Sequence, residues 1–238
     1  MQDFNDSTSR RDRKFHYEQI KNYFREDVFN KNEYYETSKN NIRQRMIFDL
    51  CISLLEDIMQ NNVDITKAFD AGCGTGDFTL ELANKFLQFR QIVGIDFLQE
   101  IVSTAQEKTQ QFEKVTFMQG NILNIPFDDR YFDVTICIDV LHHIHSDDFK
   151  TAIGELTRIT DKYLVIEIRN KKNIFHLWYN HILQPLFFKE LPIFTTSIDE
   201  VNNLIDEYNF ELDVARRIAS SRWSCRRLVL VYKRDNNS

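Results

Sequence analysis

The chain has 238 residues, of which 42% are hydrophobic and 28% are charged. This composition is typical of a folded globular protein and excludes a disordered chain, and the length suits one α/β domain with short extensions. The formal net charge of −6 disfavours a nucleic-acid substrate. The four cysteines lack the paired spacing of disulfide or zinc sites, and no apolar run is long enough to span a membrane, so we expect a cytoplasmic protein.

The N-terminal part is predicted to be a tail followed by helices. Residues 1–13 are polar and are expected to form a mobile tail. Residues 14–62 are expected to form a helical extension, because apolar side chains recur at helical spacing in 15–29 and again in 42–59. Residues 63–238 would then form the main domain.

From residue 65 onward, short β-rich runs alternate with helical segments, which is typical of βαβ units in a parallel sheet. The predicted strands are 66–71, 91–96, 114–119, 132–138, 163–168, 211–217 and 225–233. The predicted helices between them are 77–88, 98–110, 146–159 and 197–208. These elements predict an α/β fold of the Rossmann-like, doubly wound kind, with a mostly parallel seven-stranded sheet.

A glycine-rich turn follows the first predicted strand, with the sequence Asp70-Ala71-Gly72-Cys73-Gly74-Thr75-Gly76. Glycines allow positive φ and let a ligand lie against the bare main chain at a helix N-terminus. The D-x-G-x-G-x-G spacing differs from the G-x-G-x-x-G of dinucleotide-binding turns, and its carboxylate suits a ligand that carries an ammonium group. A nicotinamide-dependent oxidoreductase is therefore the weaker interpretation, and a turn that serves only strand-to-helix packing is a further alternative.

Asp96 ends the second predicted strand, about 20 residues beyond the turn. In doubly wound folds a carboxylate at this position accepts hydrogen bonds from ribose hydroxyls. Capping of the following helix is the alternative role, and both roles can hold together.

Four segments together resemble the successive motifs of class I S-adenosylmethionine-dependent methyltransferases. They are DAGCGTGDFT at 70–79, GIDF at 94–97, QGNILNIPF at 119–127 and FDVTICIDVLHHI at 132–144. The resemblance covers about residues 65–170 and implies the class I fold, S-adenosylmethionine as the cofactor and a helical insertion after the fifth strand.

The resemblance also implies roles for individual residues. The methionine part of the cofactor would be held by the glycine turn and the end of the fourth strand, the ribose by Asp96, and the adenine by Phe97, Asn121 and Ile122. The residues implied around the methionine part are Asp70, Ala71, Gly72, Cys73, Gly74, Gly76 and Asp139. Many relatives have Asp at the position of Asn121, whose amide oxygen still accepts from an amino group.

The predicted catalytic residues are His142 and His143, with His145 behind them. Methyl transfer from a sulfonium depends mainly on in-line positioning, and a base is needed only when the acceptor arrives protonated. A purely structural role for this histidine turn is the alternative. No metal site is predicted, because contiguous histidines on a turn do not point in one direction.

The segment 171–196 is predicted to be a helical lid, since Trp178, Tyr179 and Ile182 recur at helical spacing. With Tyr35 of the N-terminal extension, they would cover an acceptor pocket. The helix would alternatively rest on a membrane surface or only pack on the core. The stretch Leu191-Pro-Ile-Phe-Thr-Thr196 is loosely similar to ubiquinone-pathway O-methyltransferases.

The sequence thus predicts a methyltransferase for a small, apolar or aromatic acceptor, with oxygen slightly favoured as the methylated atom. A non-catalytic protein that binds the cofactor is the alternative, and the oligomeric state is not indicated. Arg43 or Arg45 would reach the cofactor carboxylate or remain solvated, the commoner role of a helix arginine. The C-terminal arginines are expected on an exposed strand face rather than at an anion site: Arg216, Arg217, Arg222, Arg226 and Arg227.

Overall fold

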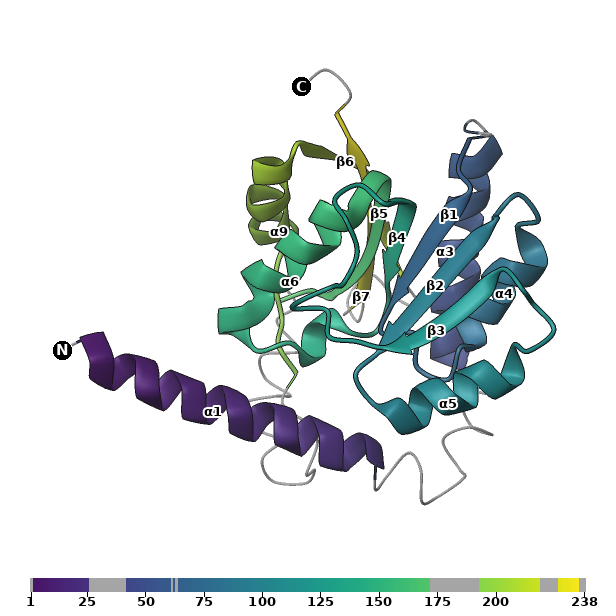
Figure 1. Ribbon diagram of the computed structural model, residues 1–238. Coiled ribbons are helices and arrows are strands. Elements are labelled where there is room, and N and C mark those ends of the chain that lie inside the picture. The colour runs from purple at the N-terminus through teal and green to yellow at the C-terminus, as the bar shows by residue number, and fades with distance from the viewer. Residues whose placement is uncertain are drawn as a thin grey trace.

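The computed structural model describes residues 2–25, 42–60, 62, 64–171, 193–218 and 227–235. These residues form a single twisted sheet with helices packed on both of its faces (Figure 1). The predicted lid residues Trp178, Tyr179 and Ile182, and Tyr35, lie outside the described residues.

The sheet has seven strands in the order β3-β2-β1-β4-β5-β7-β6. Their bounds are β1 Lys67–Ala71, β2 Gln91–Asp96, β3 Val115–Gln119, β4 Phe132–Cys137, β5 Thr160–Arg169, β6 Phe210–Arg217 and β7 Arg227–Arg234. Strands β1 to β5 are mutually parallel, whereas β7 runs antiparallel to both β5 and β6. The prediction of a doubly wound, mostly parallel seven-stranded sheet is confirmed, and the chain reverses its winding between β1 and β4.

Helices bury both faces of the sheet because successive side chains of each strand point to opposite sides. Phe69 belongs to the core beneath α6 (Ser146–Ile159) and α9 (Ile198–Ile205). The neighbouring Ala68 belongs to the core beneath α3 (Ile42–Gln60) and α4 (Asp77–Lys85). A smaller cluster packs α5 (Gln99–Lys108) against β3. Packing therefore fixes the middle of each strand, and the ends of the strands are free to form a binding site.

The first helix, α1 (Gln2–Tyr23), lies along the edge where the parallel strands end (Figure 1). Residues 2–13, which the sequence analysis expects to form a mobile tail, belong to this helix. Asp148 of α6 accepts hydrogen bonds from Arg13 at 2.9 Å and from Tyr17 at 2.8 Å. These contacts hold the C-terminal half of α1 in place. The helix can then extend toward its N-terminus without a second nucleation step.

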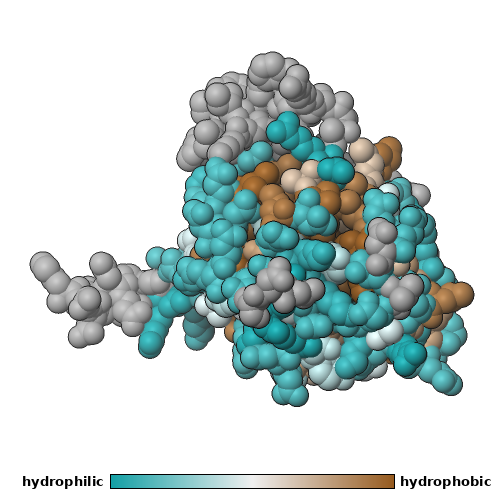
Figure 2. Space-filling model, turned by 90° about the horizontal axis from the view of Figure 1, so that it is seen from above, coloured by the Kyte–Doolittle hydropathy of each residue, from teal (hydrophilic) through white to brown (hydrophobic). Residues whose placement is uncertain are grey.

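The outer surface carries few large apolar side chains. Figure 2 shows a face that is largely hydrophilic, with hydrophobic residues gathered mainly in one part of it. Leu87 and Ile42 are the most exposed large apolar side chains among the described residues. Within the same residues, no helix combines the length and apolar character that a membrane span requires.

Candidate active site

The glycine turn between β1 and α4 has the backbone that its sequence predicts. Gly72, Gly74 and Gly76 have φ of 77°, 52° and 76°, in the left-handed region where side chains are disfavoured. Gly72 is also required for space, since an added Cβ would lie 2.2 Å from a methyl group of Val140. An added Cβ at Gly74 would meet nothing within 4 Å. The turn therefore presents bare main chain to an open space.

Two carboxylates flank this turn. Asp70 is buried at the end of β1 and accepts a 2.5 Å hydrogen bond from the Thr79 hydroxyl, and burial raises its pKa to about 6. Asp96, at the end of β2, accepts from the Gly74 amide at 3.2 Å and from the Leu98 amide at 3.1 Å. Burial also raises the pKa of Asp96. Asp96 thus ties the glycine turn to the residue that precedes α5, but it does not cap the helix as the alternative role required, because the N-cap is Leu98 and no side chain caps it.

A cavity of about 660 Å³ opens at this edge of the sheet. Most of the residues predicted to bind a cofactor line it: Asp70, Gly72, Cys73, Gly74, Asp96, Phe97, Asn121, Ile122 and Asp139. Ala71 and Gly76 are not among its lining residues, and Gly76 instead precedes α4 as its N-cap. The structure therefore gathers side chains from the ends of β1, β2, β3 and β4 around one space, as the topology of a doubly wound sheet predicts.

The end of the cavity next to β2 and β3 is formed by Phe97, Asn121 and Ile122. The side-chain oxygen of Asn121 accepts a hydrogen bond from the Leu123 amide at 3.0 Å. One lone pair of this oxygen is therefore used within the loop, and one acceptor position is left for a ligand.

The three neighbouring histidines have three different environments. His143 lines the cavity, and burial lowers its pKa to about 4, which keeps the imidazole neutral at pH 7. His142 is buried and lies behind the cavity wall, where burial lowers its pKa as well. His145 accepts from the Asp147 amide at 3.3 Å and so caps α6. Of the two predicted catalytic histidines, only His143 faces the space in which a ligand would lie.

Helix α1 supplies one wall of the cavity, a contribution that the sequence analysis did not assign. Tyr17, Ile20, Lys21 and Phe24 line the space at spacings of three and four residues. The Phe24 ring meets His143 edge-on, with ring centroids 5.6 Å apart. The signal was present in the helical spacing of 15–29, but a buried helix face does not indicate which element it covers.

Arg45, a candidate for the cofactor carboxylate, pairs instead with Asp49 at 2.6 Å and with Glu81. It is not among the residues that line the cavity, and Arg43 has no described side chain. Gln44 and Lys21 do line the cavity, and both side chains carry hydrogen-bond donors.

A group of charged side chains lies behind Asp139, where β4 and β5 end and β7 begins. Glu167 is fully buried and accepts from the Asp139 amide at 3.1 Å, while its Oε1 lies 2.9 Å from Nε of Arg227. Asp139 pairs in turn with Arg227 and, at 3.0 Å, with Arg169. The expectation that Arg227 sits on an exposed strand face is wrong, because its side chain is only 12% exposed. Burial raises the pKa of Glu167 to about 7, and Arg169 opposes that rise.

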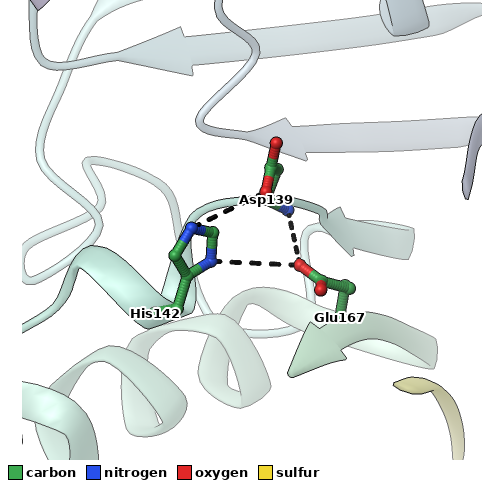
Figure 3. Close-up of side chains that lie close together, drawn as sticks. All are labelled: Asp139, His142 and Glu167. Carbon is green, nitrogen blue, oxygen red and sulfur yellow. Dashed lines mark hydrogen bonds and ion pairs between the residues drawn. The ribbon is translucent and has the colours of Figure 1, made fainter. Parts of the chain in front are cut away.

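Figure 3 shows Asp139, His142 and Glu167 in this group, with one imidazole nitrogen facing each of the two acidic residues. One ligand atom from each lies within 4.8 Å of the others, a spacing that would suit a metal ion. Two guanidinium groups, however, already approach the carboxylates of this group. Because these fixed positive charges would repel a cation, we interpret the group as an ion-pair network.

Comparison with known proteins agrees with the fold and the turn. Residues 68–162 match the family described as a methyltransferase domain. This match and the sheet order agree with the resemblance of the sequence motifs to class I S-adenosylmethionine-dependent methyltransferases.

The chain is similar to demethylmenaquinone methyltransferases over part of its length. It is 33% identical to that of Bacillus licheniformis over 92 residues, which are 39% of each chain. It is 33% identical to that of Staphylococcus aureus over 94 residues, which are 40% of this chain and 38% of the relative. The chain therefore matches well under half the length of these relatives.

Solved structures share the fold at low sequence identity. The magnesium protoporphyrin IX methyltransferase of Synechocystis PCC 6803, crystallised with bound SAH, superposes with a TM-score of 0.72 and 19% identity, over 91% of this chain and 98% of that one. A SAM-dependent methyltransferase of Methanosarcina mazei gives a TM-score of 0.61 and 20% identity, over 74% and 96% of the two chains.

Proposed function

We propose that this protein transfers the methyl group of S-adenosylmethionine to a small, largely apolar acceptor, with oxygen as the favoured methylated atom. The observation that carries the proposal is the single cavity shared by the glycine turn, Asp96 and His143. Its volume of about 660 Å³ lies within the range of ligand sites, roughly 300 to 1,000 Å³.

The cofactor is assigned to the side of the cavity nearest the glycine turn. The ammonium group of its methionine part would lie near Asp70 and the bare main chain at Gly72, and its ribose hydroxyls would donate to Asp96. The adenine would lie beside Phe97 and the Asn121–Ile122 backbone. Ala71 and Gly76 would act through the shape of the turn, since neither lines the cavity.

The acceptor is assigned to the remaining walls, which are mainly apolar. Ile20 of α1, Phe24 directly after that helix and Ile144 beyond the histidine turn line this part. The curated relatives are named for demethylmenaquinone, which supports a small apolar ring compound as the acceptor class. Tyr35, Trp178, Tyr179 and Ile182 are proposed to complete this covering.

His143 is proposed to orient a hydroxyl on the acceptor. A neutral imidazole accepts a hydrogen bond, and a pKa near 4 makes it a weak base. In the transfer, the bond between sulfur and the methyl carbon breaks as the oxygen–carbon bond forms, and the acceptor's proton is lost to His143 or to solvent. In-line positioning of the acceptor oxygen would supply most of the acceleration.

Calorimetric titration with S-adenosylhomocysteine and, separately, with NAD tests the cofactor assignment. We expect the first to bind and the second not to bind, and the opposite result would overturn the proposal. Asp96→Asn should weaken S-adenosylhomocysteine binding, while Asp213→Asn, at an exposed position of β6, should leave it unchanged.

The acceptor class is tested by incubating the protein with methyl-labelled S-adenosylmethionine and a lipid extract. We expect label in an organic-soluble product. Analysis of that product should find the new methyl group bound to oxygen, as a methyl ether or a methyl ester. His143→Ala should slow this transfer without weakening S-adenosylhomocysteine binding to the same extent. Label found only in RNA or protein would contradict the small-molecule assignment.

A further inference from the structure

The charged group behind Asp139 comes from four separate elements, and it lies largely outside the segment that matches the methyltransferase family. Asp139 follows β4, His142 lies in the short helix η2 (Leu141–His143), Glu167 and Arg169 end β5, and Arg227 begins β7. The family match ends at residue 162, so Glu167, Arg169 and Arg227 lie outside the matched segment. Of the five residues, only Asp139 lines the cavity.

Asp139 has a backbone conformation that requires support. Its φ is 62°, in the left-handed region that costs a residue with a side chain about 1 to 2 kcal/mol. The support is visible in the contacts, because the amide of Asp139 donates to the Glu167 carboxylate while its own carboxylate pairs with Arg169 and Arg227. Both the main chain and the side chain of this one cavity residue are therefore fixed by residues behind the wall.

The charges within the network balance. Once Glu167 is ionised, above its pKa of about 7, two guanidinium groups face two carboxylates, and His142 is neutral because burial lowers its pKa. His142 Nε2 lies 3.6 Å from Asp139 Oδ1 and 3.4 Å from Arg169 Nη2, so the imidazole packs between the charged groups. Removing one partner of such a buried set leaves an uncompensated charge, whereas removing one positive and one negative partner restores the balance.

The network also sits beside the turn that is proposed to hold the cofactor. The residue after Asp139 is Val140, whose methyl groups occupy the space that a Cβ on Gly72 would need. A shift of Asp139 would therefore move the wall against which the glycine turn packs. Asp139 itself lines the cavity, and its side chain is 34% exposed.

We propose that Arg227, Glu167 and Arg169, packed around His142, are positioning residues that hold the Asp139 carboxylate in the cavity toward the cationic methionine end of the cofactor. This inference rests on the proposed function, since it takes the ligand to be S-adenosylmethionine. It assigns a role in the site to the C-terminal strand β7, which lies about 60 residues beyond the end of the family match.

The test is a charge-balance series read out by calorimetric titration with S-adenosylhomocysteine, with thermal unfolding measured in parallel. Arg227→Met and Asp139→Asn should each weaken binding by about tenfold, the loss of one close charge interaction. Arg227→Lys should recover part of the loss because it keeps the charge but not the forked geometry. The double variant with Arg227→Met and Glu167→Gln should bind more tightly than Arg227→Met alone.

Arg216→Met on the neighbouring strand β6 is the matched control, because this arginine is exposed and lies outside the network. Its affinity should equal that of the unchanged protein. If folded Arg227→Met or Asp139→Asn binds S-adenosylhomocysteine as tightly as the unchanged protein does, the positioning role is overturned while the proposed function stands. If the unchanged protein itself does not bind S-adenosylhomocysteine, the proposed function fails first.

Discussion

The glycine turn and the charge network form neighbouring parts of the same cavity, but they are built in different ways. The turn is made from consecutive residues and acts through its main chain, with three glycines at positive φ. Apart from His142, the network is made from side chains between 28 and 88 residues away from Asp139 in the chain. The turn therefore depends on space and backbone freedom, whereas the network depends on charge balance.

Among the substitutions that distinguish the glycine turn from the charge network, the largest effect is expected at Gly72. Gly72→Ala places a Cβ 2.2 Å from a Val140 methyl group at a φ of 77°, so overpacking adds to backbone strain. We expect a loss of about 3 kcal/mol in the free energy of unfolding, together with loss of S-adenosylhomocysteine binding. Gly74→Ala, which meets no neighbour, should cost only about 1 kcal/mol. Equal losses in denaturant unfolding would contradict the steric explanation.

The next effect concerns the network and its pH dependence. Burial raises the pKa of Glu167 from 4.5 to about 7, so the folded state holds a proton that the unfolded state releases. This contribution to stability is complete below pH 4.5 and is lost as the pH rises through about 7. The unchanged protein should lose up to about 3 kcal/mol over this interval relative to Glu167→Gln, which has no such proton.

Urea unfolding at several pH values measures this difference. Asp70, whose pKa burial raises to about 6, remains in both proteins and its contribution cancels in the comparison. Glu207→Gln, at an exposed residue that pairs with Lys150, should follow the pH curve of the unchanged protein. Parallel curves for Glu167→Gln and the unchanged protein would show that Glu167 does not titrate in this range.

A smaller effect is expected where α1 docks on α6. Tyr17→Phe removes the hydroxyl that donates to Asp148, and Arg13→Met removes the second partner. Each should cost about 1 kcal/mol of stability and weaken ligand binding several-fold, because α1 forms one cavity wall. Lys14→Met, at an exposed position of the same helix, is the control. If ligand binding is unaffected by both changes, α1 does not help to retain the ligand.

The smallest effect is expected at Arg45. Its side chain is 54% exposed and pairs with Asp49 and Glu81 outside the cavity. Arg45→Met should change stability by no more than about 0.5 kcal/mol and leave S-adenosylhomocysteine affinity unchanged. A marked loss of affinity would instead support the direct contact with the cofactor carboxylate that its sequence position suggested.

The sequence predicted the parts of the site that are local. The positions of the strands and of the glycine turn follow from alternating segments and from residues 70–76, because each depends on neighbours within a few residues. It did not predict the burial of Arg227 beside Glu167, since that contact depends on an antiparallel pairing of β7 with β5. Nor did it separate His142 from His143, which differ only in the direction their side chains take from one short turn.

The insertion of β7 between β5 and β6 has a consequence for how the protein can be shortened. A version that ends before Arg227 would expose the hydrogen-bonding edges of both neighbouring strands, and it would also lack the guanidinium that pairs with Asp139. A fragment that ends before Arg227 should therefore aggregate rather than retain a weakened site, although the family match itself stops far earlier in the chain.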